Sequence, residues 1–264
     1  AAYSKNEGAR SASHAFLLFL DNDVYIHEDM IMSLMQQTLE SHAACFQPKI
    51  YFFEDVSRDG NADAPLQGGA LEKRSVLNST GGIANLYGYA WDRGIYENDR
   101  CQYDGDTTVL FATSAAMLIR RRALECVGGF DESYFYLNED YDVGYRLAMR
   151  GFITEYVPKA YCFHMMSGTM GRTSPRVKYL IERNRIVTIL KNYEWKTVKQ
   201  ILPALIRIKK KRYTRALAES GDRRLAYMFA ACAAWVWLVW FLPALLAKRK
   251  DAQRGRSVSD RAIF

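Results

Sequence analysis

The chain has 264 residues, of which 49% are hydrophobic and 25% are charged, and its net charge is +7. This composition is that of a folded protein and excludes a mainly disordered chain. The length allows one large domain, or one domain with an appendage. Because the basic residues are concentrated after Arg172, the last third of the chain is expected to face an anionic partner, with membrane lipid and nucleic acid as the two candidates.

The cysteines are widely spaced and form no CxxC pair, which predicts reduced, buried thiols in a cytosolic setting and argues against a zinc site. The first residues do not resemble a signal peptide and read like the interior of a longer sequence. The five cysteines are Cys45, Cys101, Cys126, Cys162 and Cys232.

A short apolar run at 15–20 ends abruptly in the sequence DND, as a buried parallel strand does at its carboxyl end. Ligand sites in open α/β sheets lie at such ends. Asp21 and Asp23 can share a divalent cation there, although an ordinary Asp/Asn turn is the alternative. Apolar residues at helical spacing from Ile31 to Leu39 predict a helix, and Cys45 to Phe53 is the next predicted strand.

The middle of the chain alternates between polar loops and apolar segments. Glu54 to Gly82 is rich in Gly, Asp and Asn, which predicts a long surface excursion or flap. Asp92 to Asp106 is also expected to be a loop, and its aromatic residues offer rings for stacking on a ligand, although exposed tyrosines are ordinary. Val109 to Ile119 is predicted to be a second buried strand, and Arg120 to Val127 a short helix that Gly128 and Gly129 end.

An acidic stretch begins the next predicted helix, which runs from Asn138, as N-cap, to Gly151, as stop. Glu139, Asp140 and Asp142 fall in its first turn. Acids in a first turn stabilise the helix dipole and need no catalytic role. The aromatic residues just before them favour the alternative, a general base held at the mouth of a loop. Arg146 is expected to pair with Asp142.

The following strand, Phe152 to Phe163, is predicted to deliver His164 at its tip. A single histidine is more often structural than a ligand. However, the strand ends at Asp23 and His164 and the loop at Asp140 can converge on one cleft. Pro175 opens a predicted helix, and another begins near Lys196.

The segment Leu225 to Ala247 contains no charged residue and is long enough to span a bilayer. Basic clusters flank both ends, so the positive-inside rule gives no orientation. Pro243 and the tryptophans fit an interfacial helix or a re-entrant hairpin equally well. A buried core helix is the remaining alternative. Membrane contact is favoured over it, because three tryptophans lie between two basic clusters.

Four motifs, in their order and spacing, resemble the family 2 glycosyltransferases with the GT-A fold, particularly bacterial rhamnosyltransferase-like members. The resemblance covers about residues 5–195 and implies an α/β fold with a mixed sheet for residues 1–195, followed in 196–264 by basic helices and the apolar segment 225–247. The motifs are LLFLDND at Leu17 to Asp23, AAMLIRRRALECVGGFDESYF at Ala115 to Phe135, NEDYDVGYRLAMRG at Asn138 to Gly151, and His164 followed by Arg183 and Asn184.

The resemblance also implies roles for individual residues. In the family the DxD pair holds Mg²⁺ or Mn²⁺ on the diphosphate of the nucleotide-sugar donor, which maps onto Asp21 and Asp23. The aspartate of the ED pair deprotonates the acceptor hydroxyl, and the histidine after the last strand contacts the metal or the diphosphate. These features map onto Asp140, with Glu139 beside it, and onto His164. The expected donor-binding residues are Asp21, Asn22, Asp23, Arg183 and Trp91.

The implied activity is the inverting transfer of a sugar, for example rhamnose, to a hydroxyl of a glycan or lipid-linked acceptor in cell-surface polysaccharide synthesis. The implied place is the cytoplasmic face of the bacterial inner membrane. A metal would neutralise the leaving diphosphate while an opposed carboxylate takes the acceptor proton. The alternatives are a metal-dependent nucleotidyl or phosphoryl transferase, against which the lack of a Gly-rich, Lys-bearing phosphate loop counts, and a non-catalytic membrane-anchored binding module. No recognised nucleic-acid module is present, so nucleic acid is not an expected partner.

The sequence departs from the family pattern in two places. Ser114 and Ala115 stand where many members have glycine, which is expected to narrow the sugar pocket. Family members carry two or three βα units ahead of the DxD, whereas 20 residues precede Asp21. Since a βαβ unit takes about 30 residues, we expect most of the nucleotide-binding half to be absent, one sheet edge to be unpaired, and this chain alone to show no measurable transfer.

Overall fold

The computed structural model of the chain describes residues 1–53, 76–165, 174–218 and 223–264, with the backbone alone at 212, 213, 215–218, 223–232 and 235. The described helices are α1 (Ala2–Ser11), α2 (Met30–Glu40), α3 (Arg121–Cys126), the short 3-10 helix η2 (Glu132–Tyr134), α4 (Glu139–Met149), α5 (Pro175–Asn192), α6 (Trp195–Ala218), α7 (Arg223–Arg254) and α8 (Asp260–Ile263). The described strands are β1 (Phe16–Leu20), β2 (Val24–Ile26), β3 (Cys45–Phe52), β4 (Leu77–Ser79), β5 (Gly82–Ala84), β6 (Ala90–Asp92), β7 (Thr108–Val109), β8 (Ala116–Arg120) and β9 (Thr154–His164).

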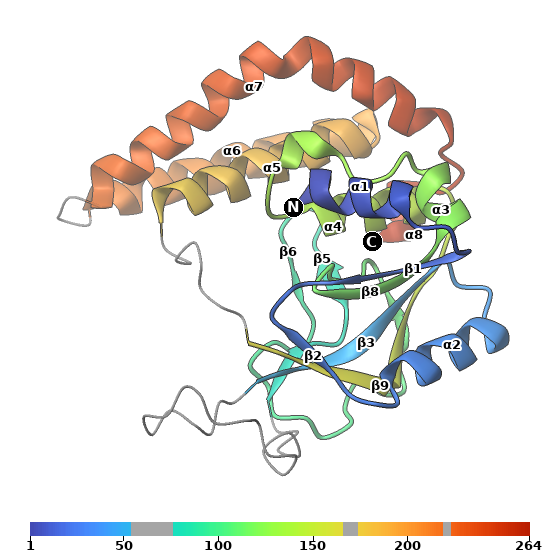
Figure 1. Cartoon of the computed structure of the whole chain (residues 1–264). Helices are drawn as coiled ribbons and strands as arrows, with labels where there is room; N and C mark the ends of the chain where they lie inside the picture. Colours follow the sequence, from blue (N-terminus) through green and yellow to red (C-terminus); the bar gives the residue numbers. More distant parts are fainter. Residues whose placement is uncertain (54–75, 166–173, 219–222) are drawn as a thin grey trace.

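A mixed, seven-stranded sheet forms the centre of the molecule (Figure 1). Its order is β1-β8-β3-β9-β2, with β4 beside β3 and β7 beside β9, while β5 and β6 form a separate hairpin. β3 and β9 pair in parallel, and β8 runs antiparallel to both β1 and β3. It follows that β1, β3 and β9 point the same way and that their carboxyl ends lie at one edge of the sheet. The predicted mixed α/β fold is confirmed.

The predicted environment of the first strand was wrong. β1 lies at an edge of the described sheet and pairs antiparallel with β8, and Leu17 alone among its five residues is buried. An apolar run of this length does not reveal the direction of its partner strand or how many of its faces are covered.

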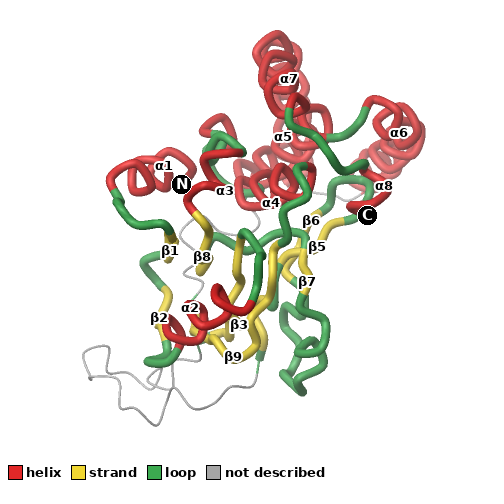
Figure 2. Tube along the Cα trace, turned by 90° about the vertical axis from the view of Figure 1, so that its right-hand side faces the viewer, coloured by secondary structure: helices red, strands yellow, loops and turns green. Residues whose placement is uncertain are grey.

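Helices cover both faces of the sheet, with α2 on one side and α1, α3 and α4 on the other (Figure 2). The alternation of side chains along each strand produces this division. Leu17 and Ile119 pack in the cluster that contains residues of α1, α3 and α4. Leu18 and Leu118, one residue away in each strand, pack in the cluster that contains residues of α2. The first of these clusters fixes α1 and α4 relative to β1, whose end leads into the acidic DND motif.

The region between β3 and β8 differs most from the prediction. Residues 54–75, most of the predicted excursion, lie outside the described residues, but Leu77–Ser79 within it is a buried strand. The predicted strand Val109 to Ile119 is wrong over most of its length, because only β7 and β8 at its ends are strands. The chain turns between them, where the Ala116 N–H donates to the Thr113 oxygen, and an isolated bridge joins Phe111 to Gly82 of β5.

The C-terminal helices pack on the sheet domain (Figure 1). α7 lies along α5, and the predicted segment Leu225 to Ala247 is the middle of this single helix, with Pro243 inside it. Asp260 of α8 accepts hydrogen bonds from the Tyr145 hydroxyl and the Glu194 N–H, at 2.7 Å each. None of the helices in the described parts of the chain combines the length and the apolar character that a membrane-spanning segment requires.

The four described cysteines are all free thiols, as predicted, but their predicted burial holds only for Cys45 and Cys162. Cys101 and Cys126 are exposed, because the first lies on the loop after β6 and the second ends α3 at the surface.

Candidate functional site

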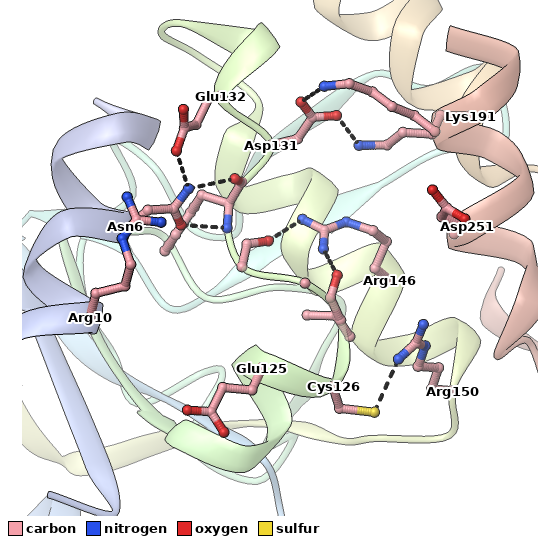
Figure 3. Close-up of a pocket in the computed structure, with 16 residues that line it drawn as sticks. Asn6, Arg10, Glu125, Cys126, Asp131, Glu132, Arg146, Arg150, Lys191 and Asp251 are labelled. Atoms are coloured by element: carbon pink, nitrogen blue, oxygen red, sulfur yellow. Dashed lines mark hydrogen bonds and ion pairs between the residues drawn. The ribbon is translucent and has the colours of Figure 1, made fainter. Parts of the chain in front are cut away.

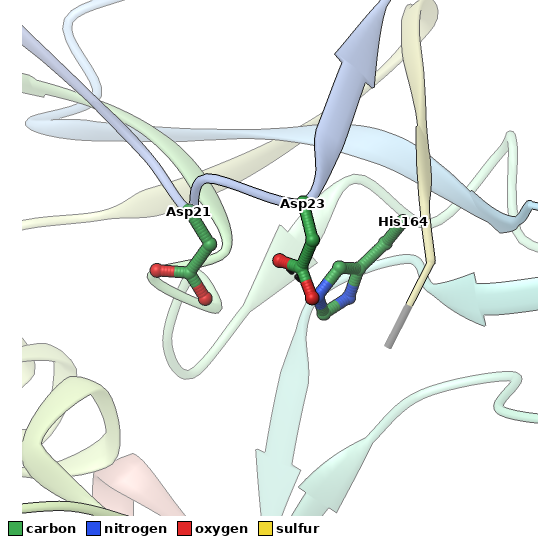
Figure 4. A group of neighbouring side chains, drawn as sticks. All are labelled: Asp21, Asp23 and His164. Atoms are coloured by element: carbon green, nitrogen blue, oxygen red, sulfur yellow. Dashed lines mark ion pairs between the residues drawn. The ribbon is translucent and has the colours of Figure 1, made fainter. Parts of the chain in front are cut away.

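The link between β1 and β2 brings the DND sequence to the edge of the sheet. The Asp21 N–H donates to the Ala115 oxygen, at 2.9 Å, and the Asp23 oxygen accepts from the Met165 N–H, at 3.0 Å. These bonds tie Asp21 to the start of β8 and Asp23 to the end of β9. In consequence the carboxylates of Asp21 and Asp23 and the imidazole of His164 come together, with one ligand atom of each within 4.8 Å of the others (Figure 4).

His164 is oriented from both sides of its ring. Its Nε2 lies 3.2 Å from Asp23 Oδ1, and its Nδ1 lies 3.4 Å from the side-chain oxygen of Asn78 on β4. Metal-binding histidines are commonly oriented by such an acceptor at the second ring nitrogen. Two carboxylates and one imidazole are a set of ligands that suits Mn²⁺. They suit Mg²⁺ less well, because Mg²⁺ prefers oxygen ligands. The residues present therefore fit a divalent cation.

Lys5 of α1 places a positive charge close to the carboxylates of Glu139, Asp140 and Asp21. Its Nζ lies 3.1 Å from Glu139 Oε1 and also donates to the Ser114 hydroxyl. Burial favours the neutral amine, but the carboxylates of Glu139, Asp140 and Asp21 outweigh it, so the pKa of Lys5 is raised. Burial also raises the pKa of Asp21, and the charges of Lys5 and His164 oppose that shift. We call Asp21, Asp23 and His164 the metal-ligand group. Lys5 thus holds a positive charge between this group and the ED pair.

Asp140 stands in a contrasting position, at the start of α4. Its two carboxylate oxygens accept hydrogen bonds from the Tyr141 N–H, at 2.8 Å, and the Ser114 N–H, at 3.3 Å. Burial and then the negative charge of Glu139 raise the pKa of Asp140 to about 7, against the opposing charge of Lys5. A carboxyl group with a pKa near neutrality is suited to general-base chemistry.

A hollow of about 270 Å³ connects these groups. Asp21, Trp91, Glu139, Asp140 and His164 all line it. The predicted convergence on one cleft holds for Asp140 and His164, whereas Asp23 contacts His164 but is not among the lining residues. Asn22 is exposed beside the metal-ligand group and is not among the lining residues.

Arg183 is also absent from the lining of the hollow. It is buried, and its guanidinium donates to the main-chain oxygens of Ser133 and Tyr134, at 2.9 and 2.7 Å. The next residue, Asn184, donates from its amide nitrogen to the oxygens of Tyr134, Tyr136 and Leu137. These contacts give the pair a role in positioning the loop before α4, and donor binding by Arg183 remains only a prediction.

That loop has an unusual backbone. Phe135, Leu137 and Asn138 all have positive φ, a region that residues other than glycine seldom occupy. Asn138 takes the N-cap position of α4 as predicted, but its side chain makes no capping bond. Such strained residues persist where surrounding contacts fix them, and they cluster at functional sites. Here the loop turns Glu139 and Asp140 into the hollow.

A larger hollow of about 560 Å³ lies between α1, α3, α4 and α7 (Figure 3). Asp131 there is paired with Lys191, at 2.7 Å, and with Lys248. Asp142 is paired with Lys191 and, as predicted, with Arg146, at 2.7 and 2.8 Å. Although burial opposes ionisation, Lys191 lowers the pKa of Asp131, and Arg146 and then Lys191 lower that of Asp142. These acids are satisfied by ion pairs, which makes this hollow structural.

Sequence reasoning missed three lining residues, Lys5, Asn78 and Asp92. Lys5 lies on α1, a polar helix without an apolar stripe, and it is 134 residues from its partner Glu139. Asn78 lies in a strand that was predicted to be part of a loop. Asp92 carried a detectable signal, since it stands beside Trp91, which was predicted to bind the donor.

The comparisons with known proteins concern the family and the fold of the chain. A family model described as "Glycosyltransferase like family 2" matches residues 2–187. Two N-acetylglucosaminyl-diphospho-decaprenol L-rhamnosyltransferases of Mycobacterium tuberculosis, from strains CDC 1551 / Oshkosh and ATCC 25618 / H37Rv, are each 35% identical over 96 residues. The match covers 35% of this chain and 31% of each relative, so the chain spans less than a third of the length of these relatives.

A solved structure is similar in fold. GalNAc-T7, crystallised with UDP, GalNAc and Mn²⁺, superposes with a TM-score of 0.50 at 12% identity, over 74% of this chain and 35% of that chain. At this identity the likeness concerns the fold alone.

Proposed function

Because the chain belongs to the glycosyltransferase-like family 2, we propose that it transfers a sugar from a nucleotide-sugar donor to a hydroxyl group of an acceptor. The observation that supports this most is the shared hollow, with the metal-ligand group Asp21, Asp23 and His164 at one side and Asp140 at the other. In a single displacement the leaving diphosphate and the attacking hydroxyl occupy opposite sides of the anomeric carbon. The reaction therefore inverts the configuration of that carbon.

The metal-ligand group would hold Mn²⁺ or Mg²⁺ on the donor diphosphate. When bound, the cation supplies positive charge that neutralises the phosphate oxygens as the bond to the sugar breaks. Asp21 and Asp23 offer the carboxylate ligands, and His164, oriented by Asn78, offers the nitrogen. The nitrogen ligand favours Mn²⁺ over Mg²⁺.

Asp140 takes the proton from the acceptor hydroxyl at its carboxylate. The Tyr141 and Ser114 N–H groups hold that carboxylate in place. Glu139 is paired with Lys5, whereas the pKa of Asp140 is raised to about 7, which makes Asp140 the base of the ED pair. The proton transfer is favourable near neutral pH because the pKa of the base is then close to the ambient pH.

The donor sugar and the acceptor are proposed from the curated relatives. Their name describes transfer of L-rhamnose to a lipid-linked N-acetylglucosaminyl diphosphate. A deoxyhexose donor and a lipid-linked or glycan acceptor, in cell-surface polysaccharide synthesis, are accordingly the first substrates to test.

Contact with a membrane surface, at its cytoplasmic face, is proposed from α7. Val236, Val239 and Trp240 are 71%, 71% and 89% exposed, and their spacing puts them on one side of the helix. Lys250 and Arg254 follow on the same helix and are exposed. An apolar stripe beside basic residues is typical of helices that lie in the interface of an anionic bilayer.

The test is an assay of the purified chain with radiolabelled UDP-, GDP- and dTDP-sugars, Mn²⁺, and a short-chain polyprenyl diphosphate bearing N-acetylglucosamine. Because the sequence predicts that transfer by this chain alone is absent or very weak, the assay uses tens of micromolar protein and hours of incubation. The products are separated so that two reactions can be told apart. Sugar transfer releases a nucleoside diphosphate, whereas nucleotidyl transfer from the same donors would release sugar 1-phosphate.

Asp140→Asn is expected to lower turnover by about two to four powers of ten, the usual effect of losing a general base. Asp251→Asn, which changes an exposed carboxylate on α7, serves as the control and is expected to leave turnover unchanged. Release of sugar 1-phosphate instead of nucleoside diphosphate would contradict the proposal. Full activity of Asp140→Asn would remove Asp140 from its role as the base.

A further inference from the structure

Asp92, the last residue of β6, lines the hollow and has one carboxylate oxygen without a hydrogen-bond partner in the described part of the chain. Its carboxyl group accepts a hydrogen bond from the Ser79 side chain. The residue as a whole is only partly buried, but Oδ1 itself is buried and has no hydrogen-bond partner in the described part of the chain. A buried carboxylate oxygen left unsatisfied is costly, and native proteins seldom retain one without a reason.

The position of Asp92 links the two ends of the hollow. It lines the hollow together with Asp140 and His164. Burial raises the pKa of Asp92 to about 6, while Ser79 and the nearby His164 oppose that shift. The charge of Asp92 in turn helps to raise the pKa of Asp140. Asp92 therefore lies within electrostatic reach of both the metal-ligand group and the base.

We propose that Asp92 is a specificity-determining residue that accepts a hydrogen bond from a hydroxyl group of the transferred sugar. The inference rests on the proposed function, in which the diphosphate lies at Asp21, Asp23 and His164 and the acceptor hydroxyl lies at Asp140. The group between these two ends is the sugar ring. Its hydroxyls are the donors that the unpartnered Oδ1 lacks.

The adjacent residue supports a sugar as the occupant. Trp91 lines the same hollow and is 45% exposed, so its ring is available to a ligand. An aromatic surface beside a charged acceptor matches a sugar, which presents apolar C–H groups and hydroxyl groups on one ring.

The experiment compares sugar recognition with diphosphate recognition. Calorimetry measures the binding of UDP, GDP and dTDP, and of UDP-glucose, GDP-mannose and dTDP-rhamnose, each with Mn²⁺, to the wild type, Asp92→Asn and Asp92→Ala. Asp106→Asn is the matched control, because this exposed carboxylate on the following loop pairs with Arg93 and does not line the hollow. Thermal melting verifies that each variant is folded. Asp92→Asn retains the shape and removes a buried charge.

The wild type is expected to bind one nucleotide sugar more tightly than the corresponding nucleoside diphosphate. Asp92→Asn and Asp92→Ala should weaken that binding by about tenfold or more, the usual effect of losing a hydrogen bond to a charged group. Their affinity for the nucleoside diphosphate should equal that of the wild type, as should both affinities of Asp106→Asn.

Equal loss of affinity for the nucleotide sugar and the nucleoside diphosphate would overturn the inference, because Asp92 would then act on the diphosphate site. Wild-type affinity of both Asp92 variants for the nucleotide sugar would also overturn it, while leaving the proposed function intact. A wild type that distinguishes none of the nucleotide sugars from its nucleoside diphosphate would count against the proposed function itself.

Discussion

The side-chain amide of Asn184 on α5 donates to the main-chain oxygen of Leu137, at 2.6 Å, two residues before Glu139. The same nitrogen also reaches the oxygens of Tyr134 and Tyr136. A helix that contributes no lining residue to the hollow therefore holds the loop whose positive φ angles turn the ED pair inward. The contact makes Asn184 a positioning residue for Asp140.

Asn184→Ala is accordingly expected to lower kcat by about tenfold to a hundredfold, since a displacement of roughly 1 Å at a reacting group has that effect. KM for the donor should change little, and the pH at which turnover is half-maximal should shift because Asp140 loses its fixed environment. Thr188→Val is the matched control. It removes the buried bond to the Tyr134 hydroxyl one turn further along α5 without touching the loop backbone. If both variants lose stability and neither shifts the pH profile, Asn184 is merely structural.

The pH dependence of turnover and of stability should both report Asp140. Because its pKa is raised to about 7, the base is protonated below that pH, and turnover should rise about tenfold per pH unit up to about pH 7 and then level off. In the unfolded chain the carboxyl releases its proton near pH 4. The folded chain therefore binds more protons between pH 4 and 7, and the contribution of Asp140 to the free energy of unfolding falls over that interval.

The predicted pH dependence of stability is checked with Asp140→Asn, which has no carboxyl group to titrate at this position. Its melting temperature should exceed that of the wild type at pH 8 and equal it at pH 4. An advantage at pH 4 as large as at pH 8 would show that the carboxyl titrates normally.

Mn²⁺ binding should depend on His164 and on a nucleoside diphosphate together, because three protein ligands leave positions that phosphate oxygens fill. Titration of Mn²⁺ with UDP present, followed by electron paramagnetic resonance, should show about tenfold weaker binding for His164→Gln and Asp23→Asn than for the wild type. His27→Gln tests a second histidine that also has two carboxylates nearby, outside the hollow. An equal loss for His27→Gln, or equal wild-type affinity without UDP, would contradict the proposed site.

Much of this arrangement was predictable from sequence, and the reason is local. The predicted strands, helices and acidic turn rest on patterns that act within a few residues. The observed ends lie within two residues of the predicted ends for β1, α2, β3, α4 and β9. The convergence of His164 and Asp140 on one cleft was predicted from the end of a strand and the start of a helix.

What the sequence did not reveal depends on contacts between distant residues. Lys5 meets Glu139 only because one apolar cluster packs α1 and α4 on the same sheet face. Asp131 and Asp142 have the same residue type and neighbourhood as Asp140, yet Lys191 lies beside them and not beside it. Which of the three aspartates stays free of an ion pair with Lys191 therefore depends on α5, and the sequence of the acidic motif does not include that helix.

The close approach of α4 to the loop before β8 requires glycine at 144. A Cβ built there would lie 2.2 Å from the Cβ and 2.7 Å from the Cα of Phe111. Gly144→Ala should lower the free energy of unfolding by about 1–3 kcal/mol, the usual cost of overpacking, in spite of the higher helix propensity of alanine. Gly8→Ala in α1 is the control, since its Cβ would meet nothing within 4 Å. Urea denaturation of both variants decides the matter, and a stabilised Gly144→Ala would show that the two segments separate freely.

The exposed side of α7 should bind anionic bilayers through apolar contact, aided by charge. The paired variant Val239→Ser, Trp240→Ser should bind vesicles of phosphatidylglycerol and phosphatidylcholine about tenfold or more less tightly than the wild type, because it removes two apolar groups that would enter the interface. Leu39→Ser is the matched control, because Leu39 is 87% exposed on α2 at the other side of the sheet. Raising the salt concentration should weaken wild-type binding without abolishing it, since the charge of Lys250 and Arg254 is screened and the apolar contact is not. Sedimentation with vesicles measures all of these. Unchanged binding of the paired variant, or an equal loss for Leu39→Ser, would show that another surface meets the membrane.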